Sequence, residues 1–222
     1  MVPEPTEPIS GSMRLWLHDL YFVCRRDMLR FFSQKSRIAM ALLQPLIWLI
    51  FMGNVMSGMT RNPYGAALLG VDRYLDFMTP GIISMTALFS GTFSGFSLVW
   101  DRRIGFLNRM LAAPLSRSAI PAGKMTAICL QVMFQACLIG LIALALGVRF
   151  AAGLSGFLLI TLIAGLFGAA MAGVSLSIAV LFKSFDALHP LLNFLTMPLM
   201  FTSNAIFPTA AMPGWMQVIA DW

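Results

Sequence analysis

Long apolar stretches recur along this chain of 222 residues, and they constrain its fold more than any other feature. A helix needs about 20 predominantly apolar residues to cross the hydrocarbon core of a bilayer. Five segments reach that length, at about 38–59, 77–100, 119–148, 151–182 and 188–208. Only 11% of the residues are charged, against about 25% in average soluble domains. The sequence therefore predicts an all-α, polytopic integral membrane protein with five spans.

Two segments precede the first span. Residues 1–12 are rich in Pro and Glu without periodicity, which predicts a disordered tail. Over residues 13–35, most aromatic and aliphatic side chains share one arc of a helix, while Arg14, Arg25, Arg26 and Arg30 fall on the other. This pattern is typical of an amphipathic helix that lies in the membrane interface. An ordinary helix of the bundle is the alternative interpretation.

The distribution of Lys and Arg predicts the orientation of the chain. With the amino terminus in the cytoplasm, the inner segments hold twelve of the basic residues and the outer loops hold three, which are Arg61, Arg73 and Arg149. Positive charge accumulates in cytoplasmic segments of membrane proteins. We therefore expect a multi-pass protein of the cell membrane with a cytoplasmic amino terminus. The net charge of +6 flanks the spans, so it indicates lipid contact rather than nucleic-acid binding.

Several catalytic motifs are absent from the sequence. It contains no GxxxxGK[ST] phosphate loop, no HExxH and no GxSxG, so nucleotide hydrolysis by phosphate-loop chemistry is excluded. The spacing of His and Cys predicts no metal site, and we expect no cofactor on this chain. All nine carboxylates lie outside the five apolar segments, which argues against an ion-coupled carrier.

A charged insert separates the second and third spans. Residues 100–124 have the sequence WDRRIGFLNRMLAAPLSRSAIPAGK. The pattern predicts a helix over about 102–111 that Pro114 ends. Ile104, Leu107, Met110 and Leu111 share one face of this helix. A solvated basic loop is the alternative, but an apolar face directed toward the cytosol favours a docking segment.

This insert resembles the first cytoplasmic loop of the ABC-2 type transporter permeases, above all the daunorubicin/multidrug resistance subgroup. A second similarity lies near the end of the sequence, in FKSF at 182–185, LLNFLTMPLMFTSNAIFP at 191–208 and MPGWMQVIADW at 212–222. It resembles the family's fifth span and its outer re-entrant hairpin, here 209–222. The family usually has six spans, so the resemblance implies a transmembrane domain over 13–222 that is truncated before the last helix.

The resemblance implies a transport subunit and not an enzyme. Two permease subunits, identical or related, would pair above two separate ABC ATPases, which would bind the ATP and Mg²⁺. The coupling loop, 101–118, would contact the ATPase through a set of residues shared with the family motif: Asp101, Arg102, Arg103, Gly105, Phe106, Leu107, Met110, Leu111 and Pro114.

The cargo stays open at the level of the sequence. The family resemblance implies outward movement of a drug-like or lipid-like amphipathic molecule. A glycan or lipid-linked saccharide exporter subunit, a membrane-embedded lipid-modifying enzyme and a membrane scaffold are the alternatives. The polar residues near the break expected at Pro198 are candidates for the translocation path: Asn193, Thr196, Ser203 and Asn204. Gln131 and Gln135, at i and i+4 in the third span, favour hydrogen bonds between helices over contact with cargo.

Overall fold

The computed structural model describes residues 13–60, 74–113, 115–148, 153–182 and 184–202, together with Gly214. The regular elements within these ranges are α-helices. They are α1 (Met13–Ser33), α2 (Lys35–Thr60), α4 (Tyr74–Thr92), α5 (Gly95–Arg103), α6 (Phe106–Ala112), α7 (Ala119–Ala145), α8 (Gly153–Leu181) and α9 (Phe185–Thr202). The predicted tail 1–12 and, except for Gly214, the predicted hairpin 209–222 lie outside the described residues.

Three helical stretches in the described part of the chain are long and apolar enough to cross a membrane: Tyr74–Arg103, Ala119–Ala145 and Gly153–Leu181. The described apolar part of α2, Ile38–Phe51, is shorter, and α9 has 18 residues and contains two prolines. The predicted class, a polytopic α-helical membrane protein, is confirmed. α1 occupies the region predicted to be an amphipathic helix before the first span.

Proline interrupts the helices less than the sequence predicts. We expected a break at Pro198, but α9 continues through both Pro190 and Pro198, and α2 continues through Pro45. Prolines are tolerated in membrane helices because neighbouring helices and local adjustments satisfy the backbone groups that the ring leaves unpaired.

The actual interruption lies inside the second predicted span, between α4 and α5. Ser175 of α8 causes it: its hydroxyl donates to the carbonyl oxygen of Thr92 and accepts from the N–H of Gly95, the latter at 3.0 Å. A side chain inserted into the backbone ladder is a common cause of a helix kink. Close approach of α8 requires glycine here, because a methyl group at Gly95 would lie 2.5 Å from the Ser175 hydroxyl oxygen.

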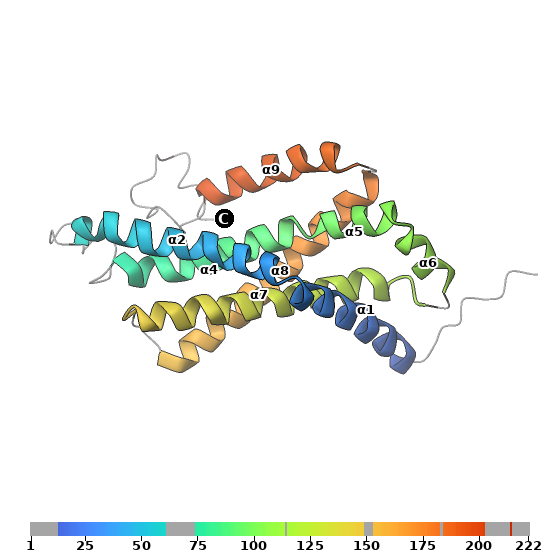
Figure 1. Ribbon diagram of the computed structural model, residues 1–222, viewed down its shortest axis with the longest axis horizontal. Helices are drawn as coiled ribbons and strands as arrows, with labels where there is room; N and C mark the ends of the chain where they lie inside the picture. Colours follow the sequence, from blue (N-terminus) through green and yellow to red (C-terminus); the bar gives the residue numbers. More distant parts are fainter. Residues whose placement is uncertain are drawn as a thin grey trace, which may run out of the picture.

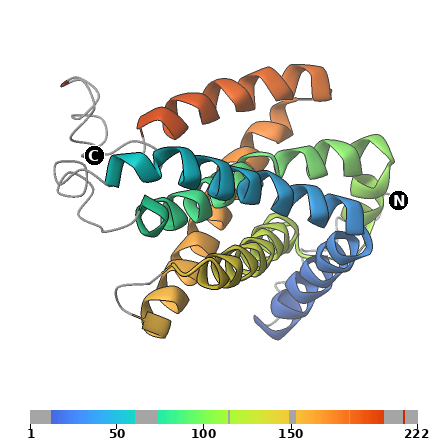
Figure 2. The same ribbon diagram turned by 60° about the vertical axis from the view of Figure 1, so that its left-hand side comes forward.

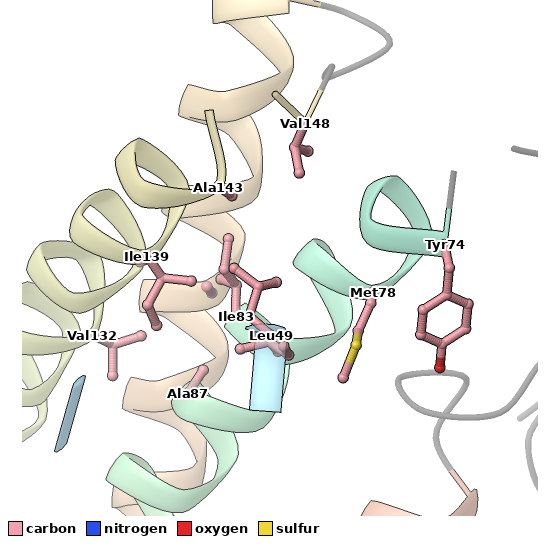
Figure 3. Close-up of a cluster of buried hydrophobic side chains, with 12 residues drawn as sticks. Leu49, Tyr74, Met78, Ile83, Ala87, Val132, Ile139, Ala143 and Val148 are labelled. Atoms are coloured by element: carbon pink, nitrogen blue, oxygen red, sulfur yellow. The ribbon is translucent and has the colours of Figure 1, made fainter. Parts of the chain in front are cut away.

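α8 packs against α7, α4 and α5 and crosses α7 and α4 at an angle, while α9 and α1 lie along different sides of the bundle (Figure 1 and Figure 2). One buried cluster joins α2, α4, α7 and α8. In Figure 3, Leu49, Ile83 and Ile139 converge in it from three of these helices. A second cluster joins α5, α8 and α9 through Leu98, Leu176 and Leu192. These two clusters hold together the helices that the loop between α5 and α7 connects.

Candidate coupling loop and membrane cavity

The loop between α5 and α7 contains a sharp change of direction at Gly105. Its φ of 69° lies in the left-handed region, which glycine adopts without the steric cost that other residues incur. α5 therefore ends at Arg103, and the short helix α6 begins at Phe106. The prediction of one continuous helix over 102–111 is wrong for this reason.

Arg102 is bound to the bundle rather than directed toward a partner. Its guanidinium donates to the carbonyl oxygens of Phe182 at 3.1 Å and of Val180 at 3.3 Å, at the carboxyl end of α8. A cation at this position satisfies carbonyls that the helix leaves unpaired and complements the helix dipole. Arg102 thus joins the end of α5 to the end of α8.

The predicted apolar face of the loop helix divides into two parts. Met110 is buried, with 6% of its surface exposed, and Leu107 packs against the α5, α8 and α9 cluster. Ile104 and Leu111 are exposed, at 54% and 49%. The turn at Gly105 changes the direction of α6 relative to α5. The four residues that one straight helix would place on the same face therefore no longer share a face. Of the four residues of the predicted apolar face, only Ile104 and Leu111 are therefore exposed to a partner, and Arg103, next to Ile104, is exposed as well.

Asp101 is the centre of a buried ion network. Its side chain is 0% exposed. One oxygen, Oδ1, accepts from Arg26 at 2.7 Å and from Arg30 at 3.2 Å, and the other, Oδ2, accepts from Lys124 at 2.7 Å. Asp101 therefore cannot contact an ATPase directly in this structure, contrary to expectation. It also lies in the stretch Tyr74–Arg103, as does Asp76, so two carboxylates do belong to an apolar helical stretch.

Lys124, near the start of α7, connects the same network to a second carboxylate. Its ammonium is 2% exposed and also lies 3.3 Å from Asp27 Oδ2 and 3.3 Å from the Ser97 hydroxyl. A buried charge is tolerated only when it is paired and hydrogen-bonded. Lys124 satisfies this requirement with three partners from α1 and α5.

α1 is held against the loop by three further contacts. The Trp16 indole donates to the Ser118 hydroxyl at 3.1 Å, and Asp19 accepts from the Ser116 N–H at 3.0 Å. The Arg26 guanidinium lies 3.8 Å from the centre of the Phe106 ring, a distance typical of a cation–π interaction. These contacts connect α1 to both sides of α6.

A cavity of about 550 Å³ opens beside this network, between helices α1, α2, α4, α5, α7, α8 and α9. Asp27, Arg30 and Lys124 line one part of it. Aromatic side chains from the bundle line another part: Phe31, Trp48, Phe89, Phe93, Phe96, Trp100 and Phe185. Phe89, Phe93 and Phe96 stack in series, with centroid separations of 6.1 and 5.7 Å.

Of the residues predicted for a translocation path, the two that the structure describes, Asn193 and Thr196, do not line this cavity. Thr196 is buried, and its hydroxyl donates to the Leu192 carbonyl at 2.7 Å. Asn193 lies 3.0 Å from the ring nitrogen Nδ1 of His189. Ser203 and Asn204 lie outside the described residues, as does Pro114 of the predicted coupling set.

Amides take the place of those residues. Gln44, Gln131 and Gln135 line the cavity, and Gln135 also accepts a hydrogen bond from Ser90 of α4 at 3.0 Å. The hydrogen bond between helices that we expected for Gln135 is therefore present. The sequence analysis did not predict that Gln135 lines a cavity, although the i, i+4 spacing of Gln131 and Gln135 indicated a polar stripe on the helix.

Sequence reasoning also missed the Asp101 network. It assigned the Arg residues of α1 to topology and Lys124 to a basic loop. The available signal was that Asp101 and Lys124 both lie where an apolar run meets the charged insert, so both occupy the same end of the bundle. In the part of the chain that the structure describes, no group of three or more His, Cys, Asp or Glu side chains could hold a metal ion.

Apolar crossing helices, a loop built on a buried ion network and a lined cavity together define a polytopic membrane protein of the transporter class. Residues 18–222 match the ABC-2 type transporter family, and the chain belongs to that family.

Curated relatives agree with this assignment. A putative transport permease, ycf38, of Cyanophora paradoxa is 30% identical over 95% of this chain and 71% of the relative. The ycf38 permease of Porphyra purpurea is 27% identical over 92% of this chain and 69% of its own length. The daunorubicin resistance ABC transporter permease protein DrrB1 of Streptomyces coeruleorubidus is 24% identical over 98% and 79%. No solved structure matches the chain.

Proposed function

We propose that this chain is the membrane subunit of an ATP-driven exporter and that it moves an amphipathic, drug-like or lipid-like molecule outward. It performs no hydrolysis, because a separate ABC ATPase would bind and hydrolyse ATP. A second permease subunit, identical or related, would complete the membrane part. Family membership and the name of the DrrB1 relative support this proposal.

The observation that carries the proposal is the connection of α6 to the bundle. Ile104, just before α6, and Leu111, within it, are exposed. Phe106, the first residue of α6, contacts Arg26 of α1. Arg26 in turn binds Asp101 of α5, which binds Lys124 of α7. Displacement of α6 by a docked ATPase would therefore act on three helices through short, charge-assisted contacts.

The cavity supports a transport role for the bundle. Its volume of about 550 Å³ falls within the range of about 300–1,000 Å³ that small-molecule sites occupy. Its lining combines stacked aromatic rings with amide and charged side chains, which suits a molecule with an apolar body and a polar end. In the proposed orientation the amino terminus and α6 are cytoplasmic and the protein spans the cell membrane.

Co-purification with a Walker-motif ATPase encoded beside this chain tests the proposal. We expect the unaltered permease to retain the ATPase in a roughly stoichiometric amount. The double substitution Ile104→Ser and Leu111→Ser should reduce the retained ATPase by at least about tenfold, since each exposed apolar side chain buried at an interface contributes about 1.5–3 kcal/mol.

Leu154→Ser is the matched control. Leu154 is also an exposed aliphatic residue, but it lies at the start of α8, away from α6 (Figure 1). It should leave ATPase retention unchanged. Arg102 and Leu107 are poorer choices, because the first binds α8 and the second packs in the core. An unaltered permease that retains no ATPase would refute the proposal.

A further inference from the structure

We infer that the cavity binds an amphiphile with an anionic headgroup, with the oxyanion at Arg30 and the apolar body along the aromatic side chains of α4 and α5. This inference rests on the proposed transport function and specifies its substrate class. The headgroup chemistry is a carboxylate or a phosphate ester attached to an apolar chain or ring system.

The charge balance of the ion network is the first argument. In the part of the chain that the structure describes, Arg26, Arg30 and Lys124 face two carboxylates, Asp27 and Asp101. The network therefore carries one net positive charge at the edge of a largely apolar cavity. Attraction between opposite charges is stronger in a medium of low dielectric constant than in water. A single anion bound in the cavity would therefore neutralise the network in an apolar environment, where this attraction is strong.

Arg30 is the network member with free hydrogen-bonding capacity inside the cavity. Among the described residues it makes one hydrogen bond, from Nη1 to Asp101, whereas a guanidinium carries five N–H donors. Its side chain is 32% exposed and lines the cavity. The guanidinium fork matches the geometry of carboxylate and phosphate oxygens, so Arg30 can hold Asp101 and a headgroup at the same time.

The two carboxylates of the network are less available to a cationic ligand. Asp101 is fully buried and accepts from three cations. Asp27 Oδ2 accepts from Lys124, and its Oδ1, a buried atom without a hydrogen bond, lies 3.6 Å from the Arg26 guanidinium. A ligand cation would have to approach these oxygens past Arg26 and Lys124, which repel it.

The aromatic part of the cavity provides the apolar half of the site. Phe89, Phe93 and Phe96 form a stacked series on consecutive turns from α4 into α5. All three line the same cavity as Arg30. An apolar chain or flat ring laid along this series would leave water while its headgroup stays at the ion network. The site is thus polarised, with one charged part and one aromatic part.

Binding of tritiated dodecyl phosphate to the complete permease in phosphatidylcholine nanodiscs tests the inference, with empty nanodiscs subtracted. The unlabelled competitors are dodecyl phosphate and dodecanoate, which are anionic amphiphiles, together with three others. Dodecyltrimethylammonium has a cationic headgroup, dodecylphosphocholine has a zwitterionic headgroup, and inorganic phosphate has no apolar chain. We expect unlabelled dodecyl phosphate and dodecanoate to displace the label at concentrations at least about tenfold lower than the cationic and zwitterionic competitors.

Arg30→Gln should weaken binding of dodecyl phosphate by about tenfold or more, since it removes the charged fork. Arg25→Gln is the matched control: Arg25 lies on the same helix, is exposed, and has no partner among the described residues. It removes the same charge and should change binding less than about twofold. If Arg30→Gln fails to fold, the competition experiment on the unaltered permease still tests the inference.

Three outcomes would overturn the inference. They are a preference for the cationic competitor, equal binding by a folded Arg30→Gln variant, and displacement by inorganic phosphate as effective as by dodecyl phosphate, which would mean a free-anion site. Because no ATPase is present, the assay is independent of the co-purification experiment. Anion-selective binding without ATPase retention would refute the transport proposal and leave the site standing.

Discussion

At the scale of single residues, the buried pair of Asp101 and Lys124 determines how the charged insert is held. Removing a charge from water costs several kcal/mol even after relaxation. Asp101 offsets this cost with three cationic donors, and Lys124 with two carboxylates and a hydroxyl. Loss of either partner would leave the other buried and underpaired.

Asp101→Asn is therefore expected to destabilise the protein strongly. Removal of one partner from a buried ion pair typically costs about 3–5 kcal/mol, which corresponds to a fall of roughly 10 °C in Tm for a chain of this size. Thermal unfolding in detergent, followed by size-exclusion chromatography, measures the change. Asp186→Asn, at an exposed position of α9, should shift Tm by less than about 2 °C.

A double-substitution cycle separates the interaction from the cost of each change. Asp101→Asn combined with Lys124→Met should be less destabilising than the sum of the two single variants, because the second change removes the charge that the first leaves unpaired. Strict additivity would show that the two side chains do not interact across their 2.7 Å contact.

At the scale of the helices, α8 organises the bundle through two separate faces lined with small residues. Gly165, Ala169, Gly173 and Ser177 recur every four residues, which predicts one packing face. Gly165 and Gly173 do meet Met133 and Met125 of α7, whereas Ser177 is exposed. The second face, toward α4 and α5, contains Ala172, Ser175 and Ala179. Small residues allow helix backbones to approach closely in membranes.

Gly91→Ala tests the closeness of the α4–α8 contact. A methyl group there would lie 2.5 Å from the carbonyl oxygen of Gly168, and backbone cannot yield as a flexible side chain can. We expect destabilisation of about 1–3 kcal/mol, measured as a lower Tm in detergent.

Gly173→Ala is the control for that substitution, because its methyl group would meet only the flexible end of Met125, the terminal methyl at 3.0 Å and the sulfur at 3.4 Å. This variant should be neutral or slightly stabilising, since alanine favours the helix by up to about 1 kcal/mol over glycine. Equal losses in the two variants would contradict the packing that the structure shows.

The helices could be predicted from sequence and most of the site could not. Apolar length is a local property, so the positions of α7 and α8 follow from composition. The α4–α5 interruption depends on Ser175, which lies 80 residues from Gly95. The ion network joins Asp101 to Arg30 and Arg26 across 71 and 75 residues. No local pattern specifies such pairings, although Gly105 within the expected loop helix was a local sign that the helix would end.

At the scale of the whole molecule, orientation decides which end of the bundle can meet an ATPase. Asn108 is exposed on α6, and Leu154 is exposed at the start of α8 near the other end. The two positions should therefore lie on opposite sides of the membrane.

Cysteine labelling measures this orientation. In a background with Cys24, Cys129 and Cys137 replaced by alanine, Asn108→Cys should react with a membrane-impermeant maleimide only in inverted vesicles. Leu154→Cys should react in intact cells. Reaction of Asn108→Cys in intact cells would place α6 outside and contradict the proposed orientation, which rests on the excess of Lys and Arg in segments predicted to be cytoplasmic.

The ion network also sets an order of assembly during synthesis. Asp27 and Lys124 are 97 residues apart in the chain, so at about 5–20 residues per second a ribosome needs about 5 to 20 seconds to reach Lys124 after Asp27. Until Asp101 is made, Arg26 and Arg30 lack that partner, and Asp27 lacks Lys124 until α7 begins, so the amphipathic surface of α1 must keep it at the lipid headgroups. The arrival of α7 then closes the network, so α1 is fastened in place by a helix made long after it.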